Sequence, residues 1–350
     1  MSTSITKTAA FMPAAPSVHH ISLSTERATR PNTTLPQYLL NEVNIEKKSF
    51  DPEEHLSYVP PTSITTMKDI GREGQGISTH AVSAPFQLFN EAAIKQMRAE
   101  IFSKEVLDNC RYKSQFVKDT IRGMGSARAP FICDAWNSPE VLEKISAAAG
   151  VDLIPAMDYE IAAINISVSD GTKSAEAAKE AAEEQANKDL STFPWHYDSY
   201  PFVCVTMLSD CSEMAGGETA VKLSNGDIVK VRGPAMGTCV VMQGRYIEHA
   251  ALQAFGGAER ISMVTSFRAK SPHIRDDTVL AGVRPISNLS ELYTQYSEYR
   301  IELFQERLKD RLKQEQRRVQ SNRPFNIPSM QRFLAEQKQF IESMMEELIE

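Results

Sequence analysis

The stretch YEIAAINISV, residues 159–168, decides the fold, because the hydrophobic pattern changes here from helical spacing toward the alternation of β-strands. It is followed by short apolar runs separated by turn residues, each with the length of a strand. The expected strands cover residues 159–168, 202–208, 218–223, 227–231, 237–242, 247–252 and 260–268. Asn225-Gly226 between two of them predicts a type I′ hairpin. Short strands spaced in this way are typical of a sandwich or a jelly-roll barrel.

Two helices are expected before these strands. Asn90 is a favourable N-cap for a helix that continues to Ile101. Ser138 precedes a second helix, which we expect to end near Gly150. We expect both helices to pack against the sheet.

The rest of the chain divides by composition. Residues 1–80 are rich in Ser, Thr and Pro and predict a partly irregular N-terminal extension. Residues 81–285 form the expected barrel domain, interrupted at 171–192 by an Ala/Glu/Lys-rich helical insertion. Because this insertion is polar on every face, it is either a surface excursion or a lid over a pocket.

Residues 286–350 carry apolar side chains at helical spacing within two charged segments. These C-terminal helices are expected to pack on the core or to form a homodimer interface. The predicted fold class is therefore α+β, with a double-stranded β-helix (jelly-roll, cupin-like) core, flanking helices and a helical C-terminus.

Bulk properties exclude several functions. The chain has 350 residues, 42% hydrophobic and 24% charged, with a formal net charge of -7 and no dense basic stripe, so a nucleic-acid partner is not expected. No segment approaches the roughly 20 apolar residues of a membrane span, and the N-terminus lacks the apolar run of a signal peptide. We expect a cytoplasmic protein without a membrane partner. Its 5 cysteines contain no CxxC pair, so neither a zinc site nor a disulfide framework is predicted.

The segment PWHYDSY, residues 194–200, carries the metal chemistry. If it is extended, His196 and Asp198 project from the same side, because alternate residues of a strand share a face. His249, at a later expected strand, is the third candidate ligand. Two histidines and one carboxylate make the facial triad of non-haem Fe(II) oxygenases, which leaves coordination positions open. We expect these three residues to be both the metal ligands and the catalytic centre.

Arg260 and Ser262 share one face of the last expected strand, where a guanidinium and a hydroxyl are suited to bind a carboxylate. Arg268 is a rival on the same face, but a surface salt bridge is its expected role. Asn165 and Arg128 are weaker candidates for contact with the co-substrate or the substrate.

Together His196-x-Asp198, His249 and Arg260-x-Ser262, with Gly216-Gly217-Glu218-Thr219 between the ligands, resemble the Fe(II)/2-oxoglutarate dioxygenase superfamily. The run from WHYDSYPF to MVTSFRAKSP further resembles a group of fungal oxygenases. The resemblance covers about residues 159–285. It implies a double-stranded β-helix, with Fe(II), 2-oxoglutarate and O2 as cofactor and co-substrates, and release of succinate and CO2. It also implies that a small molecule, an amino acid or a secondary-metabolite intermediate, is oxidised at a C–H bond.

Two alternatives remain open. A cupin-like metalloenzyme would use the same barrel and histidines without 2-oxoglutarate, which leaves Arg260 and Ser262 without a purpose. A non-catalytic binding protein would retain the barrel without the metal, and the three intact ligands argue against it.

Overall fold

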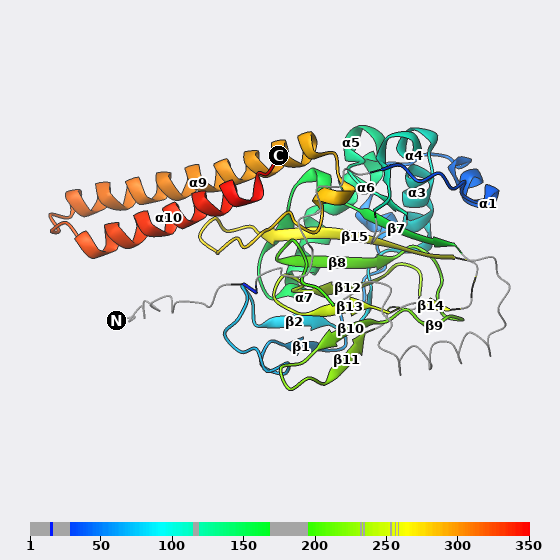
Figure 1. Ribbon diagram of the computed structural model, residues 1–350, viewed down its shortest axis with the longest axis horizontal. Coiled ribbons are helices and arrows are strands. Elements are labelled where there is room, and N and C mark those ends of the chain that lie inside the picture. Colours follow the sequence, from blue (N-terminus) through cyan, green and yellow to red (C-terminus); the bar gives the residue numbers. More distant parts are fainter. Residues whose placement is uncertain are drawn as a thin grey trace.

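The computed structural model describes residues 15–16, 29–114, 119–168, 195–231, 233, 235–252, 254–255, 257 and 259–350. The predicted insertion at 171–192 lies outside these residues, as does most of the first 28. The architecture is a mixture of helices and antiparallel sheet (Figure 1).

The helical elements fall into a group before the main strands and a pair at the C-terminus. They are α1 (Gln37–Leu40), η1 (Asn41–Val43), α2 (Pro52–His55), α3 (Glu91–Ile101), α4 (Lys104–Cys110), α5 (Gly125–Arg128), α6 (Pro130–Asn137), α7 (Pro139–Ala149), η2 (Asp158–Glu160), η3 (Arg284–Ile286), α9 (Leu289–Gln320) and α10 (Ile327–Glu347). None of the described helices is long and apolar enough to cross a bilayer.

The strands are mostly short, and β15 is the longest. They are β1 (Ile64–Thr66), β2 (His80–Ser83), β3 (Phe86–Gln87), β4 (Arg111–Tyr112), β5 (Thr120–Ile121), β6 (Leu153–Pro155), β7 (Ala163–Val168), β8 (Phe202–Met207), β9 (Ala215–Gly216), β10 (Thr219–Lys222), β11 (Ile228–Val231), β12 (Thr238–Met242), β13 (His249–Ala251), β14 (Ala254–Phe255) and β15 (Glu259–Ala269). Six of the seven expected strands contain one of these, and the seventh, 260–268, lies within β15. The expected strand 159–168 begins only at Ala163, because residues 158–160 form η2.

Among the described residues, 10 strands form the large sheet, in the order β1-β2-β12-β8-β15-β7-β5-β4, with β3 beside β12 and β6 beside β15. A smaller sheet has the order β11-β10-β13, and β14 pairs with β9. Val203 of β8 and Met242 of β12 share one hydrophobic cluster with Val221 of β10. The two sheets therefore pack on each other through apolar side chains of both.

The two predicted helices α3 and α7 are confirmed with their caps. The Asn90 side chain accepts a hydrogen bond from the Ala93 N–H at 3.0 Å, and Ser138 caps Val141 in the same way at 3.2 Å. Gly150 ends α7 in the left-handed conformation, which glycine adopts without steric cost. The two helices bury one side in the main hydrophobic core, with α7 against β2, β12 and β6 of the large sheet.

The predicted type I′ turn at Asn225-Gly226 is wrong. Gly226 has φ 90°, but Asn225 is not among the described non-glycine residues with positive φ, and a type I′ turn requires both. The Gly226 N–H donates to the Leu223 carbonyl and the Leu223 N–H to the Asp227 carbonyl, which is a three-residue hairpin loop ending in a glycine bulge. The cause is local, because the Asn225 side-chain oxygen accepts the Asp227 N–H at 3.0 Å and supports the three-residue loop.

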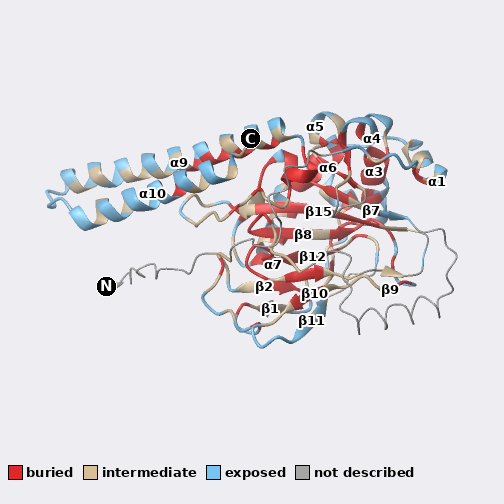
Figure 2. Ribbon diagram, in the orientation of Figure 1, coloured by how far each residue is buried: buried red, intermediate tan, exposed pale blue. Residues whose placement is uncertain are grey.

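The helices α9 and α10 form an antiparallel arm that projects from the body (Figure 1). Its base packs on the body through a second hydrophobic cluster that includes Tyr159, Tyr200, Leu292, Tyr296 and Phe340. The buried Arg300 lies 3.3 Å from the carboxylate of Asp276 and secures the same junction. Towards the tip most side chains are exposed (Figure 2).

Candidate metal centre and cavity

The site is built on a single pair of backbone hydrogen bonds between His196 and His249. The His196 N–H donates to the His249 carbonyl at 2.9 Å, and the His249 N–H donates back at 3.0 Å. This isolated antiparallel bridge places the two imidazoles side by side, with ring centroids 4.3 Å apart. His249 begins β13 of the small sheet, so the bridge fixes the segment that follows residue 194 to that sheet.

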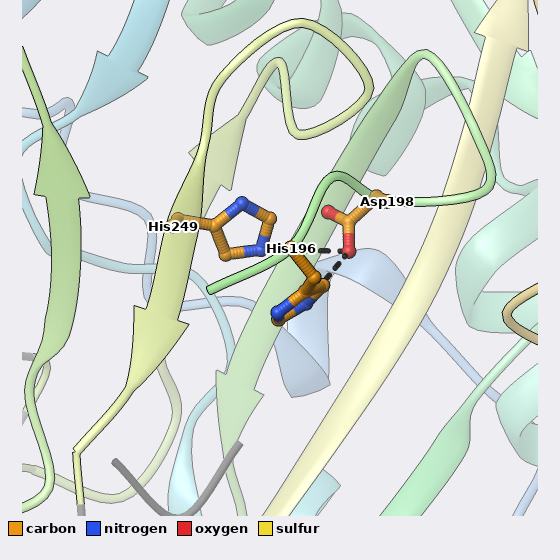
Figure 3. Close-up of side chains that lie close together, drawn as sticks. All are labelled: His196, Asp198 and His249. Atoms are coloured by element: carbon orange, nitrogen blue, oxygen red, sulfur yellow. Dashed lines mark ion pairs between the residues drawn. The ribbon is translucent and has the colours of Figure 1, made fainter. Parts of the chain in front are cut away.

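The third residue, Asp198, points back at both imidazoles (Figure 3). Its Oδ1 lies 3.6 Å from Nε2 of His196 and 3.5 Å from Nε2 of His249. Residues 197 and 198 are not in a regular strand, so the extended segment assumed from the sequence is reduced to the bridge at His196. Backbone bonds on either side hold the turn: Asp198 N–H donates to the Gly244 carbonyl at 3.0 Å, and Val279 N–H to the Ser199 carbonyl at 2.9 Å.

Gly244 makes room for the carboxylate, and the sequence reasoning missed it. A Cβ at this position would lie 1.8 Å from Oδ2 of Asp198. Because glycine has no Cβ, the Asp198 carboxylate can approach the backbone of residue 244 closely. Its place between two expected strands, 5 residues before His249, is the signal that was available.

The protonation states of His249 and Asp198 favour the binding of a cation. Nδ1 of His249 lies 2.9 Å from the Ile247 carbonyl and donates to it, so Nε2 is the nitrogen that faces Asp198 and is the one that can exchange its proton for a metal ion. Burial alone would raise the pKa of Asp198, but the charge of His249 and hydrogen bonds from both histidines hold that pKa well below its ordinary value. The carboxylate is therefore ionised.

These three residues fit a divalent metal ion. Their ligand atoms all lie within 4.8 Å of one another, and they are the only such cluster of His, Cys, Asp and Glu in the described part of the chain. Oδ2 of Asp198 is buried without a hydrogen-bond partner among the described residues, which is costly for a carboxylate unless a cation or a bound molecule satisfies it. The donor set of two imidazoles and one carboxylate suits Fe(II) and similar metals and leaves coordination positions free.

A cavity lies between strands of the two sheets, and none of the three ligand residues is among its described lining residues. Its walls are mainly apolar and come from β8, β12 and the loops around β9 and β14, including Val205, Met207, Met214, Val240 and Ala254. Arg260 is the only charged residue among the described lining residues. Such a cavity with one cation suits a small molecule that carries a carboxylate.

Arg260 is held at the cavity wall by Gly217, whose carbonyl accepts a hydrogen bond from Nη2 at 3.3 Å. The left-handed Gly217, with φ 78°, has no Cβ, and one would lie 3.3 Å from Nε of Arg260. Ser262 is buried on the same face of β15, opposite Met207, but is not among the described residues of the cavity wall.

The structure separates the other candidates from this site. Arg268 makes no surface salt bridge with any described residue, in contrast to the prediction: it stacks on the Tyr299 ring at 5.0 Å and donates to the Ala156 carbonyl at 3.2 Å. The aromatic base of the arm supplies this partner, which no local pattern indicates.

Arg128 lies 3.6 Å from Glu105 of α4, in the helical layer. Asn165 lies opposite Ser262 on β7, beside the cavity face but outside the described lining.

No family model and no curated protein matches the chain. Solved structures that overlap with it include an oxidoreductase of the 2OG-Fe(II) oxygenase family from Burkholderia pseudomallei (16% identity, 43% of this chain and 67% of that one, TM-score 0.30). Others are a Pseudomonas putida prolyl-4-hydroxylase (15%, 61% and 99%, 0.32) and a full-length Neurospora crassa protein in complex with alpha-KG (17%, 52% and 70%, 0.31). At these identities and TM-scores, the function of this chain has to be inferred from its own residues.

Proposed function

We propose that this protein is an Fe(II)- and 2-oxoglutarate-dependent oxygenase. The observation that carries the proposal is the His196–Asp198–His249 cluster, which occurs together with an apolar cavity between the two sheets whose only charged residue among the described lining is Arg260. The sequence resemblance to this superfamily supports the same proposal, and two packed antiparallel sheets are compatible with the double-stranded β-helix that the resemblance implies.

In this proposal His196, Asp198 and His249 hold Fe(II), and Arg260 anchors the distal carboxylate of 2-oxoglutarate. The bound iron, with 2-oxoglutarate and O2, supplies the oxidising chemistry. The protein contributes position and shielding. The His196–His249 bridge fixes two ligands to one sheet, and the Ile247 carbonyl keeps the proton on Nδ1 of His249. The apolar walls exclude water around the co-substrate.

The substrate is proposed from the resemblance alone: a small molecule, an amino acid or a secondary-metabolite intermediate, oxidised at a C–H bond. A cytoplasmic location belongs to the same proposal, as does the division into an extension (1–80), an oxygenase domain (81–285) and C-terminal helices (286–350). Ser262 is proposed as a second contact for 2-oxoglutarate, subordinate to Arg260.

A cupin-like metalloenzyme that does not use 2-oxoglutarate is the main competitor, since it would need the same three ligands. It gives no reason for a guanidinium at the wall of an otherwise apolar cavity, a position suited to binding the carboxylate of a ligand. A non-catalytic binding protein gives no reason for the unsatisfied Oδ2 of Asp198.

The test is an anaerobic titration that needs no substrate. Fe(II) and then 2-oxoglutarate are added to metal-free protein, and the weak visible charge-transfer band of the iron–oxoacid chelate is followed. We expect the band in the wild type, its loss in His196→Ala, and a much higher half-saturating 2-oxoglutarate concentration in Arg260→Ala. Arg268→Ala is the matched control, because Arg268 is on the same strand but contacts Tyr299.

The alternatives predict different outcomes. If iron binds but no band forms, 2-oxoglutarate is not a ligand and the cupin-like reading replaces the proposal. If no metal binds at all, the chain is a binding protein. A band in the wild type justifies screening amino acids and pathway metabolites for succinate release.

A further inference from the structure

Cation–π contacts between arginines and aromatic rings hold the two helices of the arm together. Arginines of α9 stack on aromatic side chains of α10, at ring-centroid distances of 3.8 Å for Arg300 on Phe340, 4.2 Å for Arg307 on Phe340 and 5.5 Å for Arg311 on Phe333. Near the tip, Arg318 lies 5.1 Å from the ring of Phe325, just before α10 begins. These contacts define the inward face of each helix.

Directly beside this inward face, each helix exposes apolar side chains. On α9 each exposed apolar residue comes one position after an inward arginine, and these residues are Ile301, Leu308, Leu312 and Val319. On α10 each comes one position after an inward Phe or Met, and these residues are Leu334, Ile341 and Met345. Their exposed fractions range from 40% to 69%. Exposure of so many large apolar groups on one element is unfavourable in water.

The two exposed rows lie on the same side of the arm. One residue along a helix is a rotation of about 100°. Because α9 and α10 run antiparallel, the same rotation from their facing inward sides turns both rows toward one side (Figure 1). The seven side chains therefore form one continuous apolar face, which we call the arm face.

The charges that flank the arm face on α9 have a definite order. Glu298 and Glu302 lie toward the base, and Lys309 and Lys313 toward the tip; all four are exposed. Along α9 the two acidic residues therefore precede the two basic ones. The four positions are symmetric about a point next to Gln305, with Glu302 and Lys309 as the inner pair and Glu298 and Lys313 as the outer pair. This order is complementary to itself when two copies of α9 run in opposite directions, whereas parallel copies would place like charges together.

We propose that the arm face binds the arm face of a second copy of this chain, with the two arms antiparallel in a four-helix bundle. The two-fold axis passes close to Gln305, so that Glu302 of each copy meets Lys309 of the other and Glu298 meets Lys313. Such an isologous contact needs a surface complementary to itself under a two-fold rotation, and the arm has this property in both its apolar rows and its charges. An unrelated protein partner would not require that symmetry.

The first experiment measures the mass of the full-length protein in solution by light scattering. We expect twice the 39.0 kDa of the chain for the wild type, and the monomer mass for Leu312→Glu. Val59→Glu is the matched control, because Val59 is 57% exposed and Leu312 59%, but Val59 lies on the body. Far-UV circular dichroism checks that each variant is folded.

Charge exchange tests the antiparallel direction. A tip variant, Lys309→Glu with Lys313→Glu, and a base variant, Glu298→Lys with Glu302→Lys, should each dimerise less than the wild type, because each brings like charges together. Mixed in equal amounts, the two variants should form a heterodimer, because every facing pair is again opposite in charge.

Cross-linking locates the axis. All 5 native cysteines are buried, so a surface cysteine can be oxidised selectively. Gln305→Cys should give a covalent dimer under mild oxidation. Gln320→Cys should not, since two such residues in an antiparallel pair would lie roughly 40 Å apart at 1.5 Å per residue.

A monomeric wild type, or a dimer whose mass Leu312→Glu leaves unchanged, would overturn the proposal. A covalent dimer of Gln320→Cys in place of Gln305→Cys would show that the arms pair in parallel and would reject the charge argument. None of these readouts depends on iron or on 2-oxoglutarate, so the proposed enzyme activity and the proposed dimer can fail separately.

Discussion

The carboxylate of Asp198 occupies the space that a side chain on Gly244 would fill, since a Cβ there would lie 1.8 Å from Oδ2. The same glycine accepts the Asp198 N–H through its carbonyl at 3.0 Å. One backbone segment therefore sets both the position of the ligand residue and the room for its carboxylate.

We predict that Gly244→Ala weakens Fe(II) binding roughly 10- to 100-fold, the range for changes in residues that support metal ligands. The added methyl group displaces the Asp198 carboxylate while leaving all three ligands in place. Anaerobic metal titration measures the effect. Gly74→Asn is the control, because an added Cβ at Gly74 meets no atom within 4 Å. Unchanged affinity in Gly244→Ala would mean that the carboxylate is not a ligand in this position.

If Arg260 is the main anchor of the 2-oxoglutarate carboxylate, its loss should weaken 2-oxoglutarate binding more than the loss of Ser262. Arg260→Ala should raise the dissociation constant of 2-oxoglutarate roughly 10- to 150-fold, because a hydrogen bond to a charged group contributes about 1.5–3 kcal/mol. Ser262→Ala should raise it less, by roughly tenfold at most, because its hydroxyl offers a single donor without a charge of its own and Ser262 is not among the described residues of the cavity wall. Fe(II) affinity should remain at the wild-type value in both variants. The reverse order would place the anchor at Ser262.

Iron binding should depend on pH through His249. Burial alone would lower the pKa of His249, but the negative charge of Asp198 and a hydrogen bond to it outweigh burial and raise that pKa. Protons and metal compete for Nε2, so below the raised pKa the apparent Fe(II) affinity should fall about tenfold for each pH unit. Asp198 adds no such dependence near neutral pH, because its own pKa is lowered.

The measurement is a series of anaerobic titrations from neutral to mildly acidic pH. The loss of affinity should begin at a higher pH than the value of about 6.5 for an ordinary imidazole. His273→Gln, at an exposed histidine 3.0 Å from Asp310, should leave the profile unchanged. A flat profile across this range would remove His249 from the ligand set.

The sequence was informative where local chemistry determines structure. Asn90 and Ser138 cap α3 and α7 as predicted, and the longer strands follow the apolar runs that predicted them. A two-residue strand such as β9 was not predictable, because its pairing with β14, a segment far along the chain, defines it. For the same reason the sequence did not indicate the turn that carries Asp198: Gly244 and Val279, far along the chain, hold its backbone.

The placement of the arginines could not be read from the sequence either. Arg268 and Arg300 occur in charged, helical or strand-like segments where surface ion pairs are the ordinary expectation. In the structure, Arg268 lies 5.0 Å from the ring of Tyr299 and Arg300 lies 3.8 Å from the ring of Phe340, at the base of the arm. Arg300 also pairs with Asp276, but as a buried ion pair rather than a surface one. Cation–ring contacts between distant segments leave no periodic signal.

The last prediction concerns stability, at the buried ion pair of Arg122 and Glu160. Their side chains are 5% and 1% exposed, and the Nη2 of Arg122 donates to Oε1 of Glu160. Glu160→Leu leaves the guanidinium buried without its counter-charge, so we expect a loss of about 3–5 kcal/mol in the free energy of unfolding. Urea denaturation of metal-free protein measures it. The double variant Arg122→Met with Glu160→Leu should recover much of that loss, because two apolar groups replace the pair; a double variant as unstable as the single would show that packing rather than charge is responsible.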